Sequence, residues 1–145
     1  MKVYFYHTQN IQYCLSKMQQ GEFPSHFLYG ACHLASSGID VVYHRSPSKE
    51  KSRLKTAIYT AWQVLTCHEH IDAVYATHYK GVELLVLLRA LGIFRKPIVV
   101  WHHQPIVTPK SKLREWGGRL FYRGMDRQIF FSQKLVDDSL HSPKA

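Results

Sequence analysis

The stretch IDAVYATHYKGVELLVLLRALGIFRKPIVVWHHQ, residues 71–104, decides the fold. It contains a short apolar run at 71–76, a segment of helical length at 81–93 and a second apolar run at 98–101. This order is typical of a βαβ unit with two parallel strands. Neither apolar run alternates cleanly between polar and apolar residues, which indicates strands that are covered on both faces.

Polar side chains follow both of these predicted strands. Thr77 and His78 come after the first strand, and His102 and His103 end the second. Ligands of open parallel sheets bind beyond the carboxyl ends of the strands, so we predict a site at this edge. Neighbouring strand residues point to opposite faces, so only one of His102 and His103 can face such a site. The alternative, that these imidazoles only close the strands by hydrogen bonding, stays open.

The rest of the chain continues the same alternation of strands and helices. Further strands are predicted at residues 2–6, 39–43 and 127–131, which are rich in β-branched and aromatic side chains. Helices are predicted after Asn10, after Ser25 up to Gly38, over 54–65, over 113–121 and after Ser132. The fold class is therefore α/β, a Rossmann-like open parallel sheet of about five strands with helices on both faces.

The helix over residues 54–65 has the clearest amphipathic pattern. Its apolar positions recur at helical spacing and predict one apolar face. The predicted face consists of Leu54, Ala57, Ile58, Ala61, Trp62 and Leu65.

Length and composition restrict the kind of protein. The 145 residues suffice for one domain, residues 1–145, and 46% apolar against 20% charged residues argues against disorder. The net charge of +9 favours anionic partners such as phosphates, acidic lipids or nucleic acid. Three scattered cysteines and the absence of a signal peptide predict a cytoplasmic protein with reduced thiols.

Several chemistries lack their sequence signatures. The residues after the first strand, among them His7, Thr8 and Asn10, contain no GxGxxG, so a dinucleotide site is not expected. His68 and His70 lack the spacing and the cysteine partners of a zinc site, and we expect no metal. There is no G-x-S-x-G motif for a serine hydrolase.

Three segments resemble, in order, the N-terminal domain of GT-B glycosyltransferases of the large group labelled family 4. They are FLYGACHLASSGIDVVYH at 27–44, the stretch at 71–104 and DRQIFFSQKLVDDSL at 126–140. The resemblance implies an acceptor-side domain that works with a C-terminal domain holding a nucleotide-sugar donor. It also implies retaining transfer to a glycan or lipid-linked acceptor, without a metal or another cofactor.

The resemblance also implies roles for particular residues. In the family, a histidine at the end of the strand after residue 97 lies near the transfer centre, and the spacing favours His103, with His102 as the alternative. Thr77 and His78 are then expected to bind substrate at the neighbouring strand end. The family's second domain carries two glutamates eight positions apart, and no two glutamates of this chain have that spacing.

The loop after the first strand is the family's phosphate-proximal loop. His7, Thr8 and Asn10 occupy it here, with HTQN in place of the usual glycine-rich turn. The resemblance therefore implies that these three residues bind substrate. The alternative, a purely structural loop, stays open.

A strongly basic helix follows residue 109. Its cations are Lys110, Lys112, Arg114, Arg119 and Arg123, and its apolar positions are Leu113, Trp116, Leu120 and Phe121. This composition suits a helix that contacts an anionic surface at the inner face of a membrane. The alternative is that the apolar face packs on the sheet while the cations are solvated.

Two functions remain open on the sequence alone. The first is sugar transfer, and the second is a non-enzymatic basic Rossmann-like module that binds an anionic lipid or polymer. Nucleic acid is not expected as a partner, because no helix-turn-helix or RNA-recognition signature is present.

Overall fold

The protein forms a five-stranded sheet in the computed structural model, which describes residues 1–45, 52–106 and 111–140. The strand order is β2-β1-β3-β4-β5, and all four neighbouring pairs are parallel. The strands are β1 (Lys2–Tyr6), β2 (Asp40–Tyr43), β3 (Ala73–Ala76), β4 (Ile98–His102) and β5 (Arg127–Phe130). The predicted open parallel α/β sheet is confirmed.

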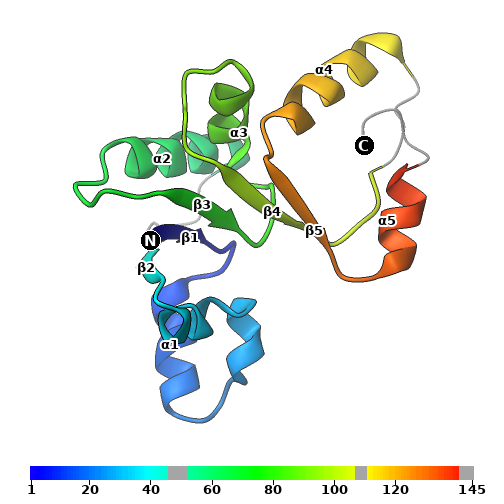
Figure 1. Cartoon of the computed structure of the whole chain (residues 1–145). Helices are drawn as coiled ribbons and strands as arrows, with labels where there is room; N and C mark the ends of the chain where they lie inside the picture. The colour runs from blue at the N-terminus through cyan, green and yellow to red at the C-terminus, as the bar shows by residue number, and fades with distance from the viewer. Residues whose placement is uncertain (46–51, 107–110, 141–145) are drawn as a thin grey trace.

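Helices cover both faces of the sheet. They are α1 (Ile11–Gln19), α2 (Arg53–Leu65), α3 (Glu83–Ala90), α4 (Lys112–Arg123) and α5 (Gln133–Leu140). Figure 1 draws α2, α3 and α4 on one side of the sheet and α1 on the other. Helix α3 packs against both α2 and α4, so these three helices form one layer, here called the helical layer.

Side-chain caps begin α1 and α5 where the sequence predicts them. The Asn10 side chain accepts a hydrogen bond from the Tyr13 backbone N–H at 3.1 Å. The Ser132 hydroxyl accepts one from the Leu135 N–H at 3.4 Å. Each cap satisfies a backbone donor that the first helical turn leaves without an intrahelical partner.

The segment predicted as a single helix after Ser25 is different, and that prediction is wrong. The chain instead forms three short 3₁₀ helices, Ser25–Leu28, Ala31–His33 and Ala35–Ser37. Tyr29 and Gly30 have φ values of 50° and 79°, which are left-handed and cannot continue a right-handed helix. The break holds Tyr29 in a loop near the carboxyl ends of the strands.

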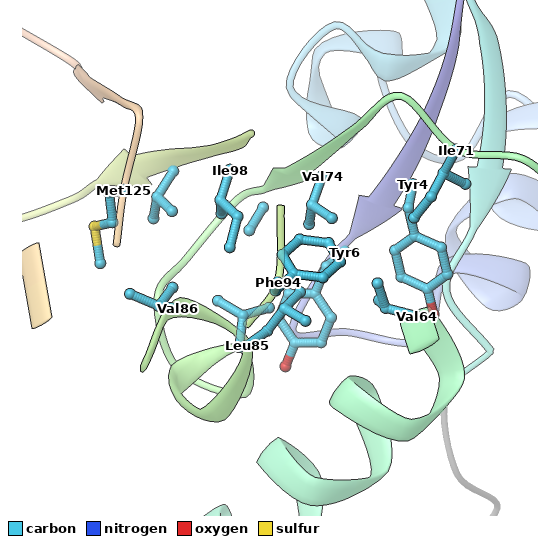
Figure 2. Packing of buried hydrophobic residues seen from close by; sticks show 13 residues of the cluster. Tyr4, Tyr6, Val64, Ile71, Val74, Leu85, Val86, Phe94, Ile98 and Met125 are labelled. Carbon is cyan, nitrogen blue, oxygen red and sulfur yellow. The ribbon is translucent and has the colours of Figure 1, made fainter. Parts of the chain in front are cut away.

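Alternating residues of β1 contribute to two cores. Tyr4 and Tyr6 point toward the helical layer, whereas Phe5 packs on the other face with Ile11 and Leu28. Figure 2 shows how the larger core joins strand residues to α2 and α3. Its buried members are Tyr4, Tyr6, Val64, Ile71, Val74, Ala76, Val82, Leu85, Val86, Phe94, Ile98, Val100 and Met125.

Helix α2 does not bury the whole apolar face that the sequence predicts. It buries smaller side chains, which are Ala57, Thr60, Ala61 and Val64. It exposes four larger ones, Leu54, Ile58, Trp62 and Leu65, here called the α2 stripe. The predicted helix is present, and its apolar face is divided into a buried part and an exposed part. Helix α2 packs against α3, and its Val64 joins the larger core, while the stripe remains exposed.

An ion pair fastens α3 to the start of β4 and β5. The Arg89 guanidinium donates to both carboxylate oxygens of Asp126, at 2.5 and 3.0 Å. Asp126 also accepts the backbone N–H of Ile98 at 2.8 Å. The hydrogen bond from Arg89, followed by that from Ile98, holds the pKa of the Asp126 carboxyl below its usual value.

Gly124, directly after α4, allows α4 to approach α3. A Cβ atom at this position would lie 2.0 Å from the Val86 carbonyl oxygen, which is backbone and cannot turn away. Gly117, within α4, has open space at the corresponding position. The two glycines therefore make a matched pair in which only one is required by packing.

We expect Gly124→Ala to lower the free energy of unfolding by about 1–3 kcal/mol, because the added methyl group overpacks the α3–α4 contact. Gly117→Ala should raise it by about 0.5–1 kcal/mol, because alanine favours the helix. Urea denaturation followed by circular dichroism measures both changes. Equal effects of the two substitutions would contradict the close approach at Gly124.

Candidate functional site

The carboxyl ends of β1, β3 and β4 lie side by side at one edge of the sheet. Tyr6 is paired with Ala76, and Ala76 with Val100, so the three chains leave the sheet in register. The Thr77 N–H donates to the Tyr6 carbonyl at 3.0 Å and extends this register past the strand end. The common edge that the sequence predicts is therefore present.

A pocket of about 640 Å³ opens at this edge, here called the strand-end pocket. Its volume is in the range of small-molecule sites. Its lining residues are His7, Thr8, Gln9, His26, Phe27, Tyr29, Gly30, Thr77, His78, Trp101, His103 and Phe131. No Lys, Arg, Asp or Glu lines it among the residues described, so aromatic rings and uncharged polar groups dominate its chemistry.

His102 ends β4 and His103 follows it, and their side chains lie on opposite sides of the sheet. His103 lines the strand-end pocket, whereas His102 is buried among the rings of Tyr79, Tyr122 and Phe130. Burial lowers the pKa of His102 to about 4. Of the two residues predicted as catalytic, only His103 is placed where a ligand of the pocket can reach it.

The proton position on His103 follows from its partner. Its Nε2 lies 2.8 Å from the Thr77 carbonyl oxygen. A carbonyl can only accept, so Nε2 carries the proton and donates it to this hydrogen bond. Nδ1 is then the basic atom of the neutral ring, available to accept a hydrogen bond or a proton.

His7 and His78, at two neighbouring strand ends, each accept a hydrogen bond from the backbone N–H two residues further along the chain. The Nδ1 of His7 accepts the Gln9 N–H, and the Nδ1 of His78 accepts the Lys80 N–H, both at 3.0 Å. With Nδ1 occupied as an acceptor, the proton of each neutral ring sits on Nε2. Both rings line the pocket, so each can offer an N–H donor to a ligand.

The pKa values of these two imidazoles are both lowered, which favours their neutral forms. Burial, and then the proximity of His103, lowers the pKa of His78 below its ordinary value. Burial is also the main cause of the lowered pKa of His7. The rings of His78 and His103 stack with centroids 5.3 Å apart and planes 16° apart, so charging both at once is unfavourable.

Tyr29 is the residue of the pocket with the most unusual backbone. It is the one non-glycine residue with positive φ among those described, a conformation that costs energy for a bulky side chain. Its ring contacts His7, Trp101, His103 and Phe131 at centroid distances of 5.7–5.8 Å. One side chain thereby connects the ends of β1, β4 and β5.

A hydrogen-bond chain holds Tyr29 in place. The Trp101 indole N–H donates to the Tyr75 hydroxyl, which donates to the Tyr29 carbonyl at 2.8 Å. Neighbouring strands and the loop are thus joined beneath the pocket. The rings of Tyr29, Trp101 and Phe131 form an aromatic wall of the pocket. Sequence reasoning missed this wall, although the spacing of Trp101 and His103, two residues apart at the end of β4, was a signal for part of it.

Of the other residues predicted to bind substrate, some line the strand-end pocket and one does not. Thr8 and Thr77 line the strand-end pocket together with His7 and His78. Asn10 does not line it, because its side chain caps α1. The structure therefore supports the alternative that Asn10 is a helix cap, whereas substrate binding by Thr8 stays a prediction.

The predicted basic helix is α4, in the helical layer and not at the pocket. Arg114 and Arg123 are exposed, as is Lys112, and Arg119 pairs with Glu115 at 2.8 Å. Lys110 lies outside the described residues. Leu113 and Trp116 are also exposed, so the apolar positions at the start of α4 do not pack on the sheet.

Two further observations concern metals and membranes. Within residues 1–45, 52–106 and 111–140, no three His, Cys, Asp or Glu side chains are grouped as a metal site. Over the same residues, none of the helices has the length and apolar character needed to cross a bilayer.

Comparison of the chain with family models, with curated proteins and with solved structures found no match. Inferences about function therefore depend on the chemistry of the pocket and of the surface.

His102 leads to a prediction about acid stability. Its pKa of about 4, and that of His44, also lowered by burial to about 4, lie below the value of about 6.5 in an unfolded chain. The unfolded state therefore binds more protons between these values, so stability is complete above pH 6.5 and is lost toward pH 4. Each histidine should contribute a loss of about 3 kcal/mol.

His102→Phe should remove one of the two contributions. Nε2 of His102 has no hydrogen-bond partner among the described residues, so phenylalanine should leave stability at pH 7 unchanged or higher. Urea denaturation at a series of pH values measures how the free energy of unfolding changes with pH. The same loss of stability between pH 6.5 and 4 in the variant as in the wild type would contradict a buried neutral imidazole at position 102.

Proposed function

We propose that this chain is the acceptor-side domain of a sugar-transferring enzyme of the GT-B, family 4 type. One observation carries the proposal, which is the aromatic, uncharged strand-end pocket with His103 in its wall. A sugar ring has C–H faces that pack on aromatic rings and hydroxyl groups that need hydrogen-bond partners. The rings of Tyr29, Trp101 and Phe131, with the imidazoles beside them, suit both requirements.

His103 is the catalytic residue of the proposal. Its neutral Nδ1 accepts a hydrogen bond from the acceptor hydroxyl and takes its proton as the new bond to the sugar forms. The Nε2 hydrogen bond to the Thr77 carbonyl holds the ring in the required tautomer. His7 and His78 donate from Nε2 to acceptor or donor oxygens, and with Thr8 and Thr77 they position the reactants.

The donor is a nucleotide-sugar, and a C-terminal GT-B domain holds it across the cleft. The acceptor is a glycan or a lipid-linked glycan whose terminal sugar occupies the strand-end pocket. No metal and no other cofactor takes part. Rate enhancement comes from positioning and from stabilisation of the departing phosphate, to which the second domain contributes.

The proposal includes a location, the cytoplasmic face of a membrane. The cations of α4, which are Lys112, Arg114, Arg119 and Arg123 with Lys110 beyond the described residues, would be attracted to anionic lipids there. A peripheral position would bring the pocket near lipid-linked acceptors.

The second candidate is a non-enzymatic basic module that binds an anionic lipid or polymer. The exposed cations of α4 favour it, but the uncharged strand-end pocket has no role in it. Saturable binding of simple glycosides in the pocket distinguishes the two candidates.

Two adjacent substitutions test the assignment. We expect His103→Ala to reduce transfer by about 10²-fold, because it removes the group that accepts the proton. His102→Phe, one residue away on the opposite face, should retain the wild-type rate. Transfer from a panel of labelled nucleotide-sugars to glycan acceptors is measured with the chain co-expressed with a C-terminal GT-B domain that binds the donor.

A binding measurement on the chain alone supplies a second readout. Glycosides that enter the pocket should quench the fluorescence of Trp101, with a weaker affinity in His78→Ala. An unchanged transfer rate in His103→Ala, or no glycoside binding at all, would contradict the proposal.

A further inference from the structure

The α2 stripe is a row of large apolar side chains without a protein partner in this structure. Leu54, Ile58, Trp62 and Leu65 follow each other at helical spacing and are 51–70% exposed. The same helix buries alanine and valine, so exposure of its largest side chains opposes the hydrophobic effect. Exposed apolar patches of this kind mark sites where a protein, a membrane or another ligand binds.

The exposed apolar residues are concentrated in the helical layer. Among the described residues, twelve large apolar side chains are exposed, and nine belong to α2, to α3 with the turn after it, or to α4. The five beyond the α2 stripe are Leu87, Leu91, Ile93, Leu113 and Trp116. All three helices of the layer, which Figure 1 draws on the same side of the sheet, therefore expose large apolar side chains.

The positive charge is concentrated in the same layer. Helices α2, α3 and α4 contain seven Lys and Arg against two Glu, whereas α1 and α5 contain two Lys against two Asp. Both glutamates of the layer, Glu83 and Glu115, are already paired with Arg53 and Arg119. Arg89 is paired with Asp126 outside the layer, so Lys55, Lys112, Arg114 and Arg123 supply the excess positive charge beside the exposed apolar side chains.

We propose that the outer face of the helical layer binds an anionic lipid bilayer, with the α2 stripe inserted among the headgroups. A bilayer offers both complements of this surface, acidic headgroups for the cations and acyl chains for Leu54, Ile58 and Leu65. Tryptophan, here Trp62 and Trp116, favours the boundary between headgroups and acyl chains. A second copy of this chain would bring two net charges of +9 together, and nucleic acid has no matching apolar surface.

This proposal assigns a role to α2 and does not depend on sugar transfer. The strand-end pocket is lined by none of the residues of the α2 stripe. Lipid binding is therefore measured without donor or acceptor. Its failure would remove the membrane location from the proposed function but would leave sugar transfer in the pocket standing.

Flotation with lipid vesicles tests the apolar part. The chain should bind vesicles of phosphatidylcholine with phosphatidylglycerol and not vesicles of phosphatidylcholine alone, and the binding should weaken with salt. Ile58→Ser with Trp62→Ser should reduce binding by at least about tenfold, because two inserted side chains are lost. Tyr13→Ser, which removes an exposed aromatic side chain from α1, is the control and should bind like the wild type.

A charge-matched pair of double variants tests the electrostatic part. Lys112→Gln with Arg114→Gln removes two cations from α4 and should weaken binding by up to about thirtyfold, the effect of two lost cation–lipid contacts. Arg127→Gln with Lys134→Gln removes two cations outside the layer and should have a much smaller effect. All substituted side chains are exposed, and circular dichroism confirms that each variant is folded.

Four results would overturn the proposal. The first is that the wild type does not bind vesicles, and the second is that the α2 variant binds as well as the wild type. The third is that the Arg127 and Lys134 variant loses as much binding as the Lys112 and Arg114 variant. The fourth is that the wild type forms dimers in sedimentation, that the α2 substitutions abolish them, and that vesicles are not bound. The last result would assign the stripe to a second copy of the chain.

Discussion

The parallel register of β1, β3 and β4 is the constraint on which the site depends. Pairing of Tyr6 with Ala76 and of Ala76 with Val100 makes the three chains end at one edge. A shift by one residue would exchange the faces and bring His102 into the pocket in place of His103. Burial of the alternate residues in two cores fixes the register, because the opposite assignment would expose the core and bury polar groups.

The arrangement of strands could be predicted because it follows from local patterns. Apolar runs, caps and turns identify five strands and most helices, and parallel order then brings His7, His78 and His103 together. The aromatic wall could not be predicted in the same way. It depends on the left-handed backbone of Tyr29, which a hydrogen bond from Tyr75, distant in sequence, helps to hold. Long-range contacts of this kind leave no periodic signal in a sequence.

The face of α2 shows a second limit of sequence patterns. Periodicity identifies the apolar face of a helix but does not identify the element or partner against which that face packs. Here α2 buries the smaller residues Ala57, Ala61 and Val64, and the large residues of the α2 stripe stay exposed. The molecule consequently has two contrasting surfaces, an uncharged aromatic pocket at the strand ends and a cationic, apolar layer over α2, α3 and α4.

The most direct measurement is a long-range proton–nitrogen correlation spectrum of the histidine rings, with and without glycosides. The account predicts that His7, His78 and His103 all carry their proton on Nε2, and that a bound glycoside shifts these three resonances while His44 and His102 stay unchanged. A proton on Nδ1 of His103, or shifts confined to histidines outside the strand-end pocket, would contradict it.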